Sequence, residues 1–196
     1  KTARQIDPDI PPVRIAFGGE AAVLRHGWIT NAAGYHFHNW YGFGAVAVDE
    51  ALALAGTHTP DSLGAFTETE SFQQTESASI PDNNGLGVTQ TLNIDELSES
   101  ATIESVRLHI SVTHPFTNDL GVYLVSPSGT ESILNPVFNE ILVGNEDLDW
   151  NLLSNAFYGE SPQGEWKLKV IDAAPGDSGT LDSWSLKFYL GEHPAS

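Results

Sequence analysis

The 196-residue sequence contains no cysteine and no methionine, and its basic residues are scarce. Without cysteine the chain can form no disulfide, no thiolate nucleophile and no Cys-based zinc or iron–sulfur site. Only 8 Lys and Arg stand against 26 Asp and Glu, which gives a formal net charge of −18. Because this charge repels phosphate backbones and anionic lipid, we predict no nucleic-acid partner, whereas bound cations are favoured.

Long hydrophobic runs are also missing. The longest, such as residues 45–48, are far shorter than the ~20 apolar residues needed to cross a bilayer, so we predict no membrane span. Hydrophobic residues make up 40% of the chain, which is too much for a disordered protein. Since a translated product begins with Met and this chain begins with Lys1, we expect a processed or trimmed piece of a longer protein whose signal peptide is gone.

The pattern of the sequence changes near residue 60. Residues 1–57 contain one good helix, predicted over residues 48–55 and stopped by Gly56. A long irregular stretch rich in glycine and aromatic residues precedes it, and such stretches are uncommon inside compact domains. We therefore interpret residues 1–57 as part of a larger domain and residues 58–65 as a linker.

The second half of the chain alternates between apolar and polar residues with a period of two. This pattern predicts strands with one buried face over residues 103–113, 120–125, 166–170 and 184–190. Turn signals rich in Gly, Pro, Asp and Asn separate them, at residues 81–85, 126–129 and 174–179. These features indicate an all-β, jelly-roll-like β-sandwich over residues 66–193. The polar residues 67–79 are compatible with either a linker or an edge strand.

Candidate catalytic and metal-binding residues are few. Gly176-Asp177-Ser178-Gly179 matches the nucleophile motif of chymotrypsin-like proteases, but no His base has a recognisable context, and a hairpin turn explains the motif better. His36 and His38 could share a metal, but no third ligand is evident nearby. Acidic residues on strand-connecting loops suggest calcium, with these candidate ligands: Asp119, Asp147, Asp149, Asp172 and Asp177.

Two stretches resemble one protein family. Residues 27–55, with Asn31-Ala-Ala-Gly34-Tyr35, then Tyr41-Gly42-Phe43-Gly44 and an Ala-rich helix, resemble the end of a kexin/furin-type subtilisin-like catalytic domain. Residues 2–4 resemble the end of a helix further upstream in that domain. The second half resembles the P domain (Homo B domain) of proprotein convertases, through DLGVYLVSPSGT at residues 119–130, Asp149-Trp150, Gly159-Glu160, GEWKLKV at 164–170 and GTLDSWSLKFY at 179–189.

The resemblance implies a secreted, calcium-dependent serine endopeptidase as the parent protein. Its catalytic residues would lie upstream, so we assign no catalytic residue in this chain and expect it to be inactive alone. The absence of cysteine resembles bacterial members of the family. The implied partner is the catalytic domain of the same protease, in a protein expected to be monomeric. The resemblance further implies that the P domain stabilises this catalytic domain, helps it to fold and modulates its dependence on calcium and pH. Aromatic residues are the candidates for the domain interface: Trp28, Tyr35, Phe37, Trp40, Tyr41 and Phe43.

The sequence is also compatible with two other functions. A stand-alone β-sandwich for carbohydrate binding or adhesion would use Tyr123, Tyr158 or Tyr189 as stacking platforms. An active hydrolase would use Ser178 as its nucleophile.

Overall fold

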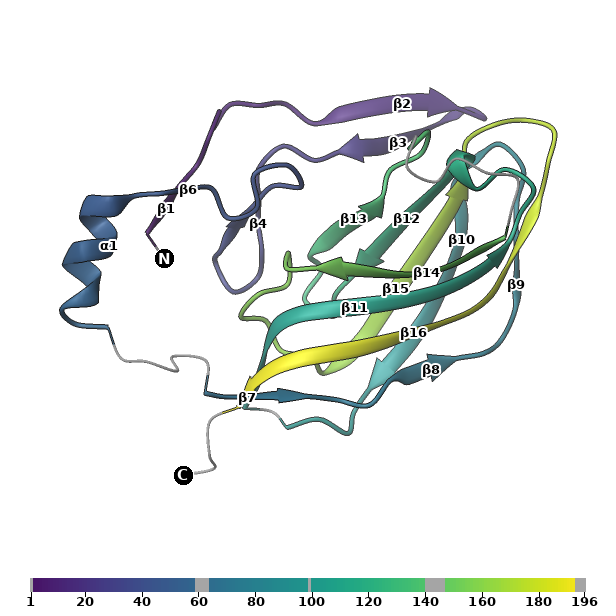
Figure 1. Ribbon diagram of the computed structural model, residues 1–196. Helices are drawn as coiled ribbons and strands as arrows, with labels where there is room; N and C mark the ends of the chain where they lie inside the picture. The colour runs from purple at the N-terminus through teal and green to yellow at the C-terminus, as the bar shows by residue number, and fades with distance from the viewer. Residues whose placement is uncertain (1, 59–63, 99, 140–146, 193–196) are drawn as a thin grey trace.

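The computed structural model describes residues 2–58, 64–98, 100–139 and 147–192. The predicted linker at residues 58–65 lies largely outside the described residues, as does residue 193. Two antiparallel sheets face each other, and the first part of the chain lies along one side of this sandwich (Figure 1). The predicted all-β class is confirmed.

Residues 2–58 hold six short strands and one helix. These are β1 (Ala3–Arg4), β2 (Val13–Phe17), β3 (Glu20–Arg25), β4 (Ile29–Thr30), β5 (His36–Phe37), β6 (Ala45–Val46) and α1 (Val48–Ala55). The helix matches its prediction. The expectation of a helix end at residues 2–4 is wrong, because Ala3 and Arg4 pair with Val46 and Ala45 as strand β1.

The β2–β3 hairpin is missing from the sequence prediction. Gly18 and Gly19 connect its strands, and both have positive φ, which is the conformation that a tight type I′ hairpin turn requires. The hairpin gives order to a stretch that we expected to be irregular.

The sandwich begins at residue 65. Its elements are β7 (Ala65–Glu68), β8 (Phe72–Gln74), β9 (Ala78–Ile80), β10 (Asn84–Ile94), β11 (Ala101–Thr113), the 3-10 turn η1 (Thr117–Asp119), β12 (Leu120–Val125), β13 (Glu131–Asn135), β14 (Leu148–Ser154), β15 (Gly164–Asp172) and β16 (Gly179–Glu192). One sheet has the order β10-β15-β12-β13, and the other has the order β14-β11-β16-β7, with β8 and β9 also paired to β16. Residues 67–79 are therefore edge strands rather than a linker.

The main core lies between the two sheets. It includes Trp166, Trp184, Phe157 and Phe188, all fully buried. The alternation in β11 changes phase between Ile103 and Val106, and a β-bulge at this point keeps both side chains on the buried face.

Strand β12 departs from the predicted alternation, because residues on both of its faces are buried. A second apolar cluster covers its outer face. The sandwich contributes Tyr123, Ile133, Val137, Ile171 and Ala173, and the β2–β3 hairpin contributes Ala22 together with the half-buried Ile15, Phe17, Val23 and Leu24. The hairpin therefore supplies the packing that makes β12 an interior strand.

Candidate functional site: the interface between residues 13–44 and the sandwich

The hairpin is joined to the sandwich by a polar contact as well as by packing. Tyr123, only 3% exposed, donates its hydroxyl hydrogen to the carbonyl oxygen of Val23 at 2.9 Å. Burial raises the pKa of the Tyr123 phenol, so this group stays a neutral donor at physiological pH.

Asn31 is the first of two buried polar anchors. Its Nδ2 donates to the carbonyl oxygens of Ala156 and Tyr158, both at 2.9 Å. Its Oδ1 accepts the N–H of Tyr35, also at 2.9 Å, and this bond closes the turn that follows Asn31. The side chain is 3% exposed, so each of these bonds forms away from water. One amide thus fixes both the local turn and its position on the loop that leads out of β14.

Glu160 is the second anchor, and it comes from the sandwich. Its carboxylate is 3% exposed and accepts three hydrogen bonds, from the Ala32 N–H at 2.9 Å, the Ser126 hydroxyl at 2.7 Å and the Thr130 hydroxyl. A buried carboxylate needs such donors to replace its hydration. Because Ala32 is one of them, loss of the interface would leave this charge with fewer donors.

Gly159 permits the close approach of the two parts. Its φ of +82° lies in the region that favours glycine, and a Cβ atom at this position would lie 2.8 Å from Cε2 of Tyr35. A larger residue would therefore separate the Tyr35 ring from the sandwich.

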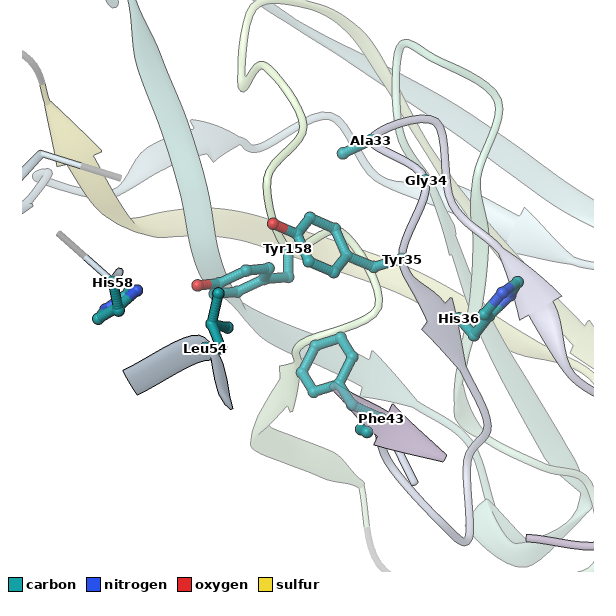
Figure 2. A pocket seen from close by; sticks show the side chains of 9 residues that line it. Ala33, Gly34, Tyr35, His36, Phe43, Leu54, His58 and Tyr158 are labelled. Atoms are coloured by element: carbon teal, nitrogen blue, oxygen red, sulfur yellow. The ribbon is translucent and has the colours of Figure 1, made fainter. Parts of the chain in front are cut away.

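Two of the six predicted aromatic residues contact the sandwich directly. The rings of Tyr35 and Phe43 pack edge-on against Tyr158, with centroid distances of 5.0 and 5.5 Å, and Phe37 packs on Phe43 at 5.7 Å. Figure 2 shows the rings of Tyr35, Phe43 and Tyr158 near Leu54 of α1 and His58. These residues line an open pocket of about 660 Å³.

The other three aromatic residues surround His38. Trp28, Trp40 and Tyr41 have ring centroids 4.8–6.2 Å from that of His38. Trp40 remains 67% exposed, and the guanidinium carbon of Arg25 lies 3.8 Å from its ring centroid.

Two further contacts tie this segment to β13. Asn39 donates from Nδ2 to the carbonyl oxygen of Ile133 at 2.8 Å. His26 Nε2 lies 3.0 Å from Glu131 Oε1, and the hydrogen bond from His26 lowers the pKa of the Glu131 carboxyl. His26 and Asn39 therefore both contact β13, which is the edge strand of the four-stranded sheet.

The candidate calcium ligands fall into two groups. The first group is Asp119, Asp172 and Asp177, at one end of the sheet, where the negative charges of Asp172 and Asp177 act on Asp119. Asp172 is fully buried, and its Oδ2 lies 3.4 Å from His114 Nε2. Burial raises the pKa of both Asp119 and Asp172.

The remaining two candidates, Asp147 and Asp149, are exposed at the start of β14, where Asp149 lies 3.6 Å from His109. Across the described part of the chain, no three His, Cys, Asp or Glu side chains are arranged to hold a metal ion.

The geometry does not support the alternative catalytic and metal-binding roles. Ser178 is exposed in a turn, whereas His114 is 1% exposed and has both ring nitrogens engaged, Nε2 near Asp172 and Nδ1 with the Phe116 N–H at 3.1 Å. His36 contacts Thr30 at 2.9 Å, and His38 accepts the N–H of Trp40 at 3.1 Å. The two histidines therefore have separate partners.

The three candidate tyrosine platforms for sugars are each packed against other residues of the chain. Tyr123 is buried under the hairpin, Tyr158 packs against Tyr35, and Tyr189 is stacked at 6.3 Å on Phe66. Tyr123 is buried and the other two are half-buried, so none of the three is a fully exposed ring.

Sequence reasoning missed Asn31 and Glu160 as anchors. Asn31 stands at the start of the Asn-x-x-Gly-Tyr motif, which was a usable signal for a structural turn. Glu160 lies in a loop without periodicity, and only its burial distinguishes it from other acidic residues.

Comparison with known proteins identifies the sandwich. Residues 103–188 match the family model of the proprotein convertase P-domain. An extracellular serine protease of Aeromonas sobria is 34% identical over 194 residues, which cover 90% of this chain and 31% of that protein. Human proprotein convertase subtilisin/kexin type 6 is 30% identical over 184 residues, covering 85% of this chain and 18% of the human protein.

A solved structure supports the same assignment. The crystal structure of the Aeromonas sobria serine protease in complex with a chaperone superposes with a TM-score of 0.85 at 29% identity, covering 98% of this chain and 38% of the protease. The chain thus spans less than two fifths of the length of these relatives. No described helix has the length and apolar character needed to cross a bilayer. The chain therefore carries a proprotein convertase P-domain and is homologous to the C-terminal, P-domain region of subtilisin-family serine proteases.

Proposed function

We propose that this chain is the C-terminal part of a secreted, bacterial, kexin-like serine endopeptidase. In this proposal the P domain stabilises the catalytic domain of the same, monomeric protease, and the 196 residues alone hydrolyse nothing. Similarity to an extracellular Aeromonas protease supports the location, and the engagement of both ring nitrogens of His114 by Asp172 and Phe116 supports the lack of activity. The high negative charge argues against nucleic acid as a partner.

The buried contact between Asn31 and the loop at residues 156–158 carries the proposal. Residues 27–55 resemble the end of a catalytic domain, and Asn31 joins this segment to the sandwich through two hydrogen bonds. A domain that binds only the folded form of its neighbour stabilises that form by mass action. The P domain thus opposes unfolding of the protease from its C-terminal end.

This role is tested by the thermal inactivation of the longer protease, which includes the catalytic domain that the proposal places before residue 1. Asn31→Ala should remove about 1–3 kcal/mol of stabilisation and shorten the half-life of activity at elevated temperature by about fivefold or more. Asn151→Ala, at an exposed position on β14, is the matched control and should leave the half-life unchanged. Equal half-lives for Asn31→Ala and the unmodified protease would remove the basis for the proposal.

Labelling with a fluorophosphonate probe tests the lack of activity in the isolated chain. We expect no label, because His114 has no free ring nitrogen for Ser178. Labelling that disappears in Ser178→Ala would show a hydrolase instead.

Calcium binding by the P domain remains part of the proposal. Support comes from the net charge of −18, which favours a bound cation. Among the described residues Asp119, Asp172 and Asp177, at one end of the sheet, form no three-ligand cluster, and Asp172 is already engaged by His114 and by the N–H of Ala174. With a dissociation constant of ~1 mM, 10 mM calcium would add about 1.4 kcal/mol and raise Tm by about 3–5 °C.

Melting at constant ionic strength measures the calcium effect. Asp119→Asn should abolish the rise if the ion lies at this end, whereas Asp149→Asn should abolish it if the ion lies near β14. A Tm that calcium leaves unchanged would mean that this chain binds no calcium.

A further inference from the structure

His38 occupies an unusual position in the segment that contacts the sandwich. It begins a tight turn in which its N–H donates to the Gly42 carbonyl at 2.9 Å and its carbonyl accepts the Gly42 N–H at 2.8 Å. The side chain is 1% exposed. The next residue, Asn39, makes the hydrogen bond to Ile133 of β13, so the turn carries one of the anchors of the interface.

The hydrogen bonds of the His38 ring require its neutral form. Nδ1 accepts the N–H of Trp40 at 3.1 Å, so this nitrogen carries no hydrogen. Nε2 is buried and has no hydrogen-bond partner among the described residues. Protonation of Nδ1 would place two donors face to face and bury a positive charge that no described carboxylate contacts by a hydrogen bond.

The groups around His38 add to this preference. The rings of Trp28, Trp40 and Tyr41 enclose it, and Arg25, which lies over Trp40, brings a second positive charge close. Burial first, and then Arg25, lower the pKa of His38, while Asp7 opposes them with a smaller effect.

We propose that His38 is an acid-sensitive latch: its protonation opens the turn at residues 38–42 and releases Asn39 from β13. This inference rests on the proposed role of the interface, because it names a condition under which the attachment of residues 13–44 weakens. The sandwich itself stays folded when this turn opens.

The sign of the pH effect follows from linkage. In the open turn His38 is a solvated imidazole with an ordinary pKa near 6.5, whereas in the closed turn its pKa is lower. The open form therefore binds the proton first. The equilibrium constant for opening is constant above pH 6.5 and rises, by at most about tenfold per pH unit, as the pH falls below that value.

Amide hydrogen exchange of the full chain tests this proposal. After correction for intrinsic exchange rates, the opening constant for the amides of residues 38–44 should rise by about threefold or more between pH 7 and pH 5.5. Amides of β16 should show no such change. His38→Asn should abolish the rise, since an Asn Oδ1 can accept the same N–H two residues on without titrating.

His36→Asn is the matched control, because His36 is exposed in the same segment and should leave the rise intact. Asn31→Ala, which tests the interface itself, should raise opening equally at both pH values. An unchanged opening constant in the unmodified chain, or a rise that survives in His38→Asn, would overturn the proposal.

An NMR titration needs no substitution. The Cε1 proton of His38 should titrate below the ordinary imidazole pKa of 6.5, together with changes in the signals of Asn39 and Ile133. Titration of His38 at or above this ordinary value would contradict the latch.

Discussion

The sandwich and residues 2–58 differ in the side chains that they bury. In the sandwich, Trp166, Trp184 and Phe188 are fully buried between two sheets that share one continuous core. In residues 2–58, the buried hydrophobic residues are two alanines, and helix α1 has no buried residue at all. A region with so little apolar burial gains little free energy from its own packing. The folded structure of residues 2–58 therefore depends on contacts with the sandwich.

Directional polar contacts therefore do more in residues 2–58 than in the sandwich. Asn31 and His38 are buried there, each with defined hydrogen-bond partners, and Glu160 of the sandwich accepts the N–H of Ala32. Hydrogen bonds of this kind define the position of one segment relative to another, but few other side chains can form them. Regions held in this way open at lower free energy than a hydrophobic core. The comparison predicts that equal substitutions will have unequal effects in the two regions.

Substitution of a tryptophan in each region should show the largest difference. Trp184 is fully buried, so Trp184→Ala should lower the free energy of unfolding by about 3–5 kcal/mol. Trp40 is 67% exposed, so Trp40→Ala should cost less than about 1 kcal/mol. Urea denaturation of both variants measures this difference. Equal losses would mean that the two regions share one core.

Substitution of one glutamate at the interface and one on the surface should give the next largest difference in stability. Glu160→Ala leaves three donors without their buried acceptor and should cost about 2–3 kcal/mol, or roughly 4–10 °C in Tm. Glu165, exposed and paired with Lys167 at 3.2 Å, is the control, and Glu165→Ala should cost less than about 0.5 kcal/mol. A Glu160 variant as stable as the Glu165 variant would show that the carboxylate does not hold the interface.

Gly159→Ala should have an intermediate effect. A Cβ atom at φ +82° is strained and would press on Tyr35, so we expect a loss of about 1–2 kcal/mol, measured by thermal unfolding. Gly129 has a similar φ of +88° but open space around its Cβ position, and Gly129→Ala controls for backbone strain alone. If both variants lose the same stability, contact with Tyr35 contributes nothing.

Acid should weaken the contact between His26 and Glu131 slightly. The pKa of Glu131 is lowered by its hydrogen bond from His26, so the stability that it contributes is present above its ordinary pKa of 4.5 and is lost as the pH falls through the lower folded value. Because Glu131 is more than a third exposed, the effect should not exceed about 1 kcal/mol.

Thermal melts from pH 6 to pH 3 should show a smaller loss of Tm in Glu131→Gln than in the unmodified chain. Asp149→Gln, at the exposed pair with His109 within the sandwich, is the control. Identical acid profiles for Glu131→Gln and the unmodified chain would show that the pair across the interface adds no stability.

The sequence predicts the sandwich better than it predicts the interface. Period-two patterns locate β11, β12, β15 and β16 because each strand buries at least one face in a common core. The same pattern fails for the outer face of β12, since residues 13–25 that cover it are distant in the chain. Periodicity reports the burial of one element and does not identify what covers it.

The interface residues show the same limit in another form. All six interface candidates are aromatic, yet only Tyr35 and Phe43 pack against Tyr158, whereas Trp40 is largely exposed. Asn31 and Glu160 have residue types that are usually exposed, and each has a hydrogen-bond partner more than a hundred positions away in sequence. Only the three-dimensional arrangement shows such pairs.

Hydrogen exchange at the Ala32 amide tests the central claim most directly, because this N–H donates to Glu160 across the interface. The account predicts strong protection of the Ala32 amide in the unmodified chain. The same N–H also lies 3.3 Å from Thr130 Oγ1, so the account predicts selective loss of protection in the double variant Glu160→Ala/Thr130→Val, with the amides of β11 and β16 unchanged. An Ala32 amide that exchanges as fast as in an unstructured peptide, or one that stays protected in this double variant, would contradict the claim that buried polar contacts hold residues 13–44 on the P domain.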